Sequence, residues 1–428
     1  MASSRALSLD QSPPIEAPLR FFLTAPLYGV AAGVTVAARA ETVTASRWAP
    51  DTLAAVHLVA LGFMLQVMAG ALLQLLPVAV GAAVPLGRPI AALTHAGLNA
   101  GTVLLAAAFL GGGAALFPLA AAVLVVTLLA YASALSVALW RSRAVGPTLL
   151  ALRLAALALA VTAGLGFTLA SALGLSWNVP FIALTNVHAA WGLLGFALCL
   201  LAAVSYLVVP MFQLTPGYPV AVARALPLAL GAGLVAWSWG VPSGQRPLAL
   251  AGAALLAAAT WGFVLQTVRL RRSSKRRVRD ATFWAFRLGL LSLSLAAAAA
   301  AGAYLSPPGP WSFRLEYLAG VFVLAGAFPA FISGMLFKIL PFLVWLHLSR
   351  SGPGAPLMHE VLRPQLPRAQ VLTHGAAVLL LCAGAAAPGL AAAGGVAFAA
   401  SHALLAWTLV SGLSVYRAGL RARAPTPA

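Results

Sequence analysis

Long apolar runs with almost no charged side chains constrain this chain more than any other feature. Of its 428 residues, 62% are apolar and 8% are charged, whereas about a quarter of the residues in soluble domains are charged. So few charges cannot cover the surface of a water-soluble domain, and soluble classes of protein are therefore excluded. Because a helix satisfies its backbone hydrogen bonds internally, these runs predict transmembrane helices.

Twelve such runs, interrupted by Pro, Gly and Arg, predict an all-α bundle of about twelve transmembrane helices. The expected spans are 21–38, 52–82, 90–110, 116–140, 148–174, 181–209, 226–241, 247–268, 282–305, 313–347, 369–391 and 393–416. The segment before the first span is polar and lacks a small-residue cleavage site, so we expect no removed signal peptide. Cys199 and Cys382 both lie in apolar runs, which excludes a disulfide framework.

The net charge of +19 is distributed as in membrane proteins. Of the 26 Lys and Arg residues, 21 fall on the same side of the predicted membrane as the two termini, and 4 fall on the other side. Because basic residues collect in cytoplasmic loops, both termini are predicted to be cytoplasmic. The lipid bilayer, and not a nucleic acid, is the expected partner of these charges. The Ala/Arg/Gly-rich composition favours a multi-pass protein of a bacterial inner (plasma) membrane.

An internal repeat indicates how the twelve helices are organised. The second, sixth and tenth spans end near Pro77, Pro210 and Pro341, which are 133 and 131 residues apart, and each has a glycine fifteen residues before its proline. A period of four helices predicts three pseudo-threefold-related four-helix units. The predicted divisions are an N-terminal tail (1–20), repeat units 21–141 and 148–268, a basic cytoplasmic loop (269–281), repeat unit 282–416 and a C-terminal tail (417–428).

Histidines inside the predicted spans are candidate cofactor ligands, because a titratable group in lipid is costly unless it has a role. The topology places His57 and His188 at the outer starts of the second and sixth helices, and His402 at a similar depth in the twelfth. Neutral imidazole binds iron and copper, and a haem needs axial ligands at matching depth. We expect His57 and His188 to be first-choice ligands of a haem or metal ion, with His402 as a partner. The competing interpretation is hydrogen-bonded core histidines.

Other polar side chains within the spans suggest a different function. Lys338 and Gln74 occupy equivalent repeat positions near the inner ends of their helices, and His95 and His374 are expected in the inner half. These four would line the path of a cofactor-free transporter or channel for a small solute. Lys338 is instead expected to extend to the interface, as long basic side chains do. Glu316 lies at the outer start of the tenth helix, within reach of solvent.

The sequence resembles subunit I of the haem–copper oxidase superfamily. The resemblance is carried by the twelve helices, the threefold division and the phrases His57-Leu-Val-Ala-Leu-Gly-Phe and Gly195-Phe…Val209-Pro-Met-Phe. It is nearest to distant membrane relatives close to the haem-bearing proteins of the nitric-oxide response. The resemblance implies that His57 is an axial ligand of a low-spin haem and that His188 binds copper.

Departures from that family exclude its main activity. The seventh span, 226–241, has no histidine, although the family places copper ligands there, and Ala319 and Val321 stand where the tenth helix should carry two haem ligands. Oxygen reduction is therefore not expected, and no catalytic residue is assigned. What remains is a fold relative with degenerate ligands that binds either one haem or metal ion, in redox or stress handling, or no cofactor. A transporter, or a structural partner in a respiratory membrane complex, is the alternative.

Overall fold

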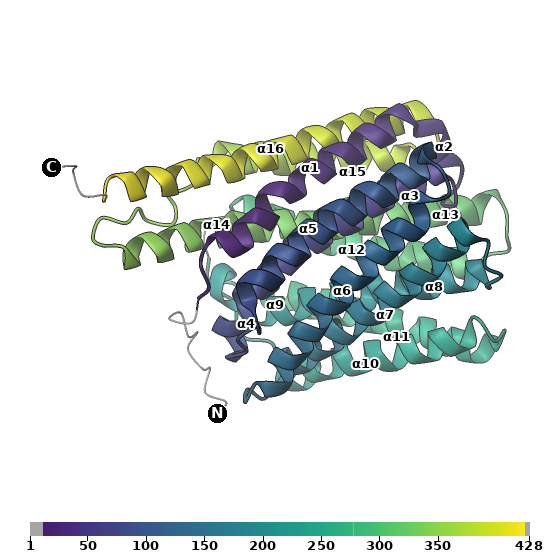
Figure 1. Cartoon of the computed structure of the whole chain (residues 1–428), viewed down its shortest axis with the longest axis horizontal. Coiled ribbons are helices and arrows are strands. Elements are labelled where there is room, and N and C mark those ends of the chain that lie inside the picture. Colours follow the sequence, from purple (N-terminus) through teal and green to yellow (C-terminus); the bar gives the residue numbers. More distant parts are fainter. Residues whose placement is uncertain (1–11, 277, 424–428) are drawn as a thin grey trace. The chain divides into compact units, whose positions relative to one another are not determined.

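The computed structural model describes residues 12–276 and 278–423, and every regular element in these ranges is a helix (Figure 1). Twelve helices in this part of the chain are long and apolar enough to cross a bilayer. The prediction of an all-α membrane protein with twelve spans is confirmed.

The bounds of most spans agree with the prediction to within a few residues. Nine spans are single helices or nearly so: α1 (Glu16–Ala38), α5 (Gly87–Ala107, extended by η3, Ala108–Gly112), α6 (Leu116–Arg141), α7 (Pro147–Leu175), α10 (Val220–Gly240), α11 (Arg246–Arg272), α12 (Ala281–Leu305), α15 (Gln365–Ala383) and α16 (Pro388–Arg421). The largest difference is at α15, which was expected to run to 391. Pro388 begins the next helix, since its fixed φ and missing N–H suit a first helical position, and the alanines before it conceal the turn.

Each of the remaining three spans is α-helical at both ends and π-helical in the middle. They are α3–η2–α4 (Pro50–His57, Leu58–Leu65, Gln66–Val80), α8–η4–α9 (Phe181–Ala190, Trp191–Leu198, Cys199–Gln213) and α13–η5–α14 (Pro310–Gly320, Val321–Ala327, Phe328–Arg350). A short helix, α2 (Ala40–Ala45), precedes the first of them. These are the second, sixth and tenth spans, on which the repeat was predicted.

The π-helical segments η2, η4 and η5 occupy the same place in the repeat. Each contains one of the glycines of the pattern, Gly62, Gly195 or Gly326. A Cβ on Gly195 would lie 2.8 Å from the Ala158 side chain, and one on Gly326 would lie 2.5 Å from the Ser292 hydroxyl. The glycines therefore let a neighbouring helix approach closely. The repeat thus recurs in backbone conformation, while its threefold arrangement in space stays a prediction.

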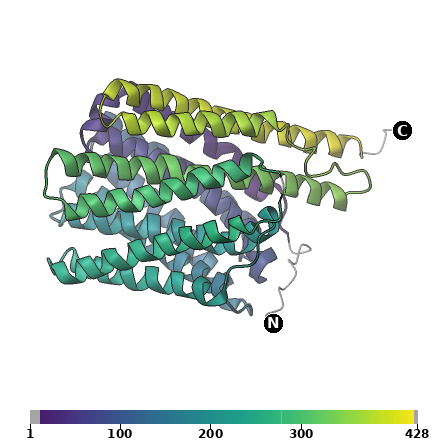
Figure 2. The same ribbon diagram turned by 180° about the vertical axis from the view of Figure 1, so that it is seen from behind.

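By internal packing the described chain divides into two compact units. Unit 1 comprises residues 12–18 and 68–276, and unit 2 comprises residues 19–67 and 278–423. In unit 1, α5, α6 and α7 pack in sequence, and α10 pairs with α11. In unit 2, α15 packs along α16 (Figure 2), and α12 packs against η5 and α14.

We expect Gly62→Ala to lower the melting temperature of the purified protein. The Tyr28 ring occupies the space that the new methyl group would need, and overpacking of this kind costs roughly 1–3 kcal/mol. The matched control is Gly320→Ala, since no atom lies within 4 Å of a Cβ at that position. The control should keep or slightly raise the melting temperature, because Ala favours helix over Gly. Equal effects of the two substitutions would contradict the packing role of Gly62.

The predicted orientation can be tested by cysteine labelling in a variant lacking Cys199 and Cys382. Ser243→Cys, between α10 and α11, should react with a membrane-impermeant maleimide in intact cells. Lys275→Cys, which follows α11 at its other end, should react only after the cells are opened, because the basic loop is predicted to be cytoplasmic. The reverse pattern would show that the charge distribution has been misinterpreted.

Candidate functional site

Small residues bring α1 and α16 of unit 2 into backbone contact and fix the position of His402. A Cβ on Gly33 would lie 2.5 Å from the Ala399 nitrogen, and one on Gly395 would lie 2.6 Å from the Ala37 nitrogen. Close approach through glycine is a common way for membrane helices to associate. One turn from Gly33, the imidazole of His402 lies directly on Gly29, where any side chain would collide with it.

His402 is a buried imidazole with one ring nitrogen hydrogen-bonded and the other without a partner among the described residues. Its Nδ1–H donates to the Phe398 carbonyl at 2.9 Å. The ring contacts Phe63 of η2 and Phe398, with centroids 4.6 and 4.2 Å away. The residue is 0% exposed, and Nε2 has no hydrogen-bond partner among the described residues. A buried imidazole whose Nδ1 is fixed in this way presents an Nε2 lone pair, as metal-binding histidines do.

His374 of α15 lies beside His402, with ring centroids 5.9 Å apart. Ser401 joins them: its hydroxyl donates to the Phe398 carbonyl at 2.9 Å and therefore accepts from His374 Nδ1 at 3.2 Å. The Nε2 atom of His374 has no hydrogen-bond partner among the described residues. Sequence reasoning placed His374 deeper than His402. Because α15 begins at Gln365 and ends at Ala383, His374 lies at its middle and level with His402.

Gln66 is a buried polar residue that sequence reasoning overlooked. It follows η2 directly, one turn after Phe63, and it is 0% exposed. Neither of its side-chain amide atoms has a hydrogen-bond partner among the residues described. An isolated glutamine in the apolar run Leu65-Gln66-Val67-Met68 was the available signal, since an unpaired buried amide costs several kcal/mol, roughly 2–7.

The two first-choice ligands each bond a backbone carbonyl and are partly exposed. His57, the last residue before η2, donates from Nδ1 to the Leu53 carbonyl at 2.7 Å. In unit 1, the Nδ1 of His188 lies 3.1 Å from the Thr162 carbonyl of α7, and the ring covers Gly166. The interval of 133 residues between Pro77 and Pro210 pairs His57 with Ala190. His188 therefore lies two residues before the position that corresponds to His57.

The remaining polar residues predicted within spans have defined surroundings. In unit 1, the Gln74 amide donates to the Ser12 hydroxyl at 2.6 Å, and the carbonyl of the partly exposed His95 accepts from Asn99 at 2.6 Å. In unit 2, Lys338 forms an ion pair with Asp280 at 2.6 Å. Asp280 directly precedes α12, so Lys338 reaches a carboxylate at the end of that span, and its extension to the interface stays a prediction.

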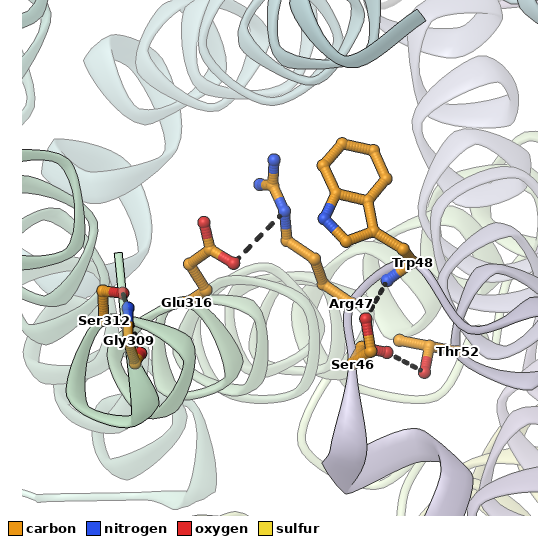
Figure 3. A network of polar contacts seen from close by, with 7 residues as sticks. All are labelled: Ser46, Arg47, Trp48, Thr52, Gly309, Ser312 and Glu316. Atoms are coloured by element: carbon orange, nitrogen blue, oxygen red, sulfur yellow. Dashed lines mark hydrogen bonds and ion pairs between the residues drawn. The ribbon is translucent and has the colours of Figure 1, made fainter. Parts of the chain in front are cut away.

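Glu316 belongs to a polar network at one end of unit 2, where α2, α3 and α13 meet (Figure 3). Its carboxylate lies 3.4 Å from Nε of Arg47, whose guanidinium carbon is 4.2 Å from the centre of the Trp48 ring. Burial lowers the pKa of the Arg47 guanidinium, and the charge of Glu316 opposes this shift. The network joins the α2–α3 loop to α13. Glu316 therefore has a structural role in holding these two segments together.

The donor set restricts what could be bound. Among the described residues, no three His, Cys, Asp or Glu side chains lie close enough to share a metal ion. A haem requires only one or two protein ligands, because the porphyrin supplies four nitrogens. The buried imidazoles among the described residues therefore offer too few donors for a three-histidine copper site.

Comparison with known proteins does not add a family to this description. No protein-family model matches the sequence, and no curated protein matches it significantly. The resemblance to the oxidase subunit therefore rests on the residues quoted above.

The Lys338–Asp280 pair should contribute measurably to stability. Both side chains are mostly buried, with 23% and 27% exposure, and Asp280 also caps α12 by accepting from the Phe283 amide at 3.1 Å. Lys338→Met and Asp280→Asn should each lower the melting temperature, with Asn retaining the cap. The double variant should lose less than the sum, with a coupling of about 0.5–3 kcal/mol. Strictly additive losses would mean that the ion pair is energetically neutral.

Proposed function

We propose that this polytopic membrane protein binds a haem, or a single copper ion, through buried imidazoles and acts in redox or stress handling without reducing oxygen. The observation that carries the proposal is the orphaned Nε2 of His402 in the core of unit 2. A buried acceptor without a partner costs about 1–3 kcal/mol. A bound metal centre would remove that cost.

The surroundings of His402 support the role of an axial ligand. Phe398 sets the tautomer, and Gly29 leaves room for the ring itself. His374, bonded through Ser401, is a second buried imidazole of the same unit at the same level. His57 and His188 remain proposed ligands from the resemblance, each with Nδ1 directed to a backbone carbonyl. A haem bound there would supply one-electron chemistry, while these residues would hold and orient it.

The proposed function does not include oxygen reduction, because side chains that could act as the required ligands are missing. The helix α10 carries no histidine, and Ala319 and Val321 lack ligand atoms in their side chains. Electron-transfer or respiratory membrane proteins would be natural partners. Transport has less support, because Lys338 and Gln74, proposed to line a path, are engaged with Asp280 and Ser12.

We expect protein purified from haem-replete cells to show a Soret absorption band, or bound copper by elemental analysis. His402→Ala should remove most of the band, and added imidazole should restore it by occupying the space left beside Gly29. The control is His359→Ala, because His359 is an exposed loop residue, and this variant should keep the full band. Size-exclusion profiles and melting temperatures check that each variant is folded. A folded wild-type preparation without colour or metal would refute the proposal.

A further inference from the structure

A groove in unit 1, between α9, α10 and α11, is almost entirely apolar. It encloses about 240 Å³. Its apolar lining comes from α10 and α11, with Leu226 and Phe263 among the side chains, and α9 contributes Tyr206. Ala225, Ala258 and Gly262 line it and are exposed. Because exposed residues of a transmembrane helix face lipid, the groove opens toward the hydrocarbon of the bilayer.

Two tyrosines close the groove at one end. The rings of Tyr206 and Tyr218 lie 5.0 Å apart, and both line the groove. Thr267 donates to the Phe263 carbonyl, so the Tyr218 hydroxyl donates to Thr267 at 2.8 Å. Burial raises the pKa of Tyr218, which keeps this hydroxyl protonated. Tyrosines with an apolar ring and a bonded hydroxyl are typical of the membrane interface.

Beyond the tyrosines lies a basic turn, defined here as residues 269–276. Three of its side chains form hydrogen bonds to the end of α9. Nε of Arg271 donates to Oε1 of Gln213 at 2.7 Å, the Ser274 hydroxyl donates to the Gln213 carbonyl at 2.5 Å, and Arg276 donates to the Phe212 carbonyl at 2.7 Å. The turn is thus held in place before any ligand arrives, which reduces the entropic cost of binding.

The positive charge of this turn is not balanced by any acidic residue in the long segment of unit 1 to which it belongs. The segment 68–276 contains no Asp or Glu at all. Arg269 and Arg272 are exposed, and no hydrogen bond or ion pair of either guanidinium is found among the described residues. These two exposed guanidinium groups can therefore bond an anion that is not part of the protein.

Helical spacing places the charge in line with the groove. Arg269 follows Gly262 by seven residues and Gln266 by three, so the three residues share one face of α11. At 1.5 Å per residue, Arg269 lies about 10 Å along the helix from Gly262. An apolar groove followed at this distance by a cationic, partly interfacial end matches the two parts of a phospholipid.

We propose that the groove and the basic turn together bind one anionic glycerophospholipid, with an acyl chain beside Gly262 and the phosphate at Arg269 and Arg272. Charge complementarity selects an anionic headgroup, and the predicted orientation places it in the cytoplasmic leaflet. The site is independent of any haem or metal.

The test uses full-length protein in mixed micelles, with bound lipid counted by native mass spectrometry. Phosphatidylglycerol and phosphatidylcholine with identical acyl chains are compared, and inorganic phosphate competes in a separate arm. We expect a clear preference for phosphatidylglycerol, since each basic residue near the surface contributes about fivefold. Equal retention of the two lipids would overturn the proposal, and displacement by phosphate alone would reassign the site to the free anion.

Substitutions then locate the site. Arg269→Gln with Arg272→Gln should remove most of the preference, whereas Arg246→Gln, at the opposite end of α11, should not. Gly262→Leu should lower retention of both lipids by filling the groove; no protein atom lies within 4 Å of a Cβ there, so the fold should tolerate it. An equal loss on Arg246→Gln would show that overall charge, and not this site, selects the lipid. Unchanged retention in Gly262→Leu would exclude the groove.

Discussion

Polar groups inside a bilayer have no water to bond, and this constraint accounts for most of the structure. Many threonine hydroxyls along the spans bond the carbonyl one turn back, as Thr162 and Thr260 do. Lys338 meets Asp280, and Tyr131 donates to the Ala69 carbonyl at 2.8 Å. Among the described residues, the buried side chains that keep a polar atom without a hydrogen-bond partner include Gln66, Thr94, Thr102, Ser205, His374 and His402. The functional proposal follows from the imidazoles in this group.

The fold was largely predictable because its signals are local. Apolar runs gave the number of spans, and Pro and Gly gave most of their ends. The glycine–proline spacing identified the three helices that prove to contain η2, η4 and η5. The π-helical turns themselves were not predictable, because Gly62, Gly195 and Gly326 reveal a small side chain but not the hydrogen-bond pattern around it.

The candidate site was predictable only in part, because its contacts join residues far apart in the chain. His402 was identified from its position in a span, but its contact with Gly29 depends on the meeting of α1 and α16. The pairing of His374 with Ser401 required the true ends of α15 and α16, which an alanine-rich turn obscured. The depth of each histidine in the membrane was inferred from the predicted span boundaries. Because the end of α15 was predicted several residues too late, at 391, His374 was placed deeper than His402 although the two lie level.

The π-helical segments give these spans a place where the chain length can change. A π-helical turn holds more residues than an α-helical turn, so loss of a single residue within η2 would allow the segment to become α-helical without turning α4 relative to α3. The same loss within α3 or α4 would rotate everything after the deletion by about 100° relative to everything before it. Single-residue deletions should therefore be better tolerated in these three segments than in the α-helices that flank them.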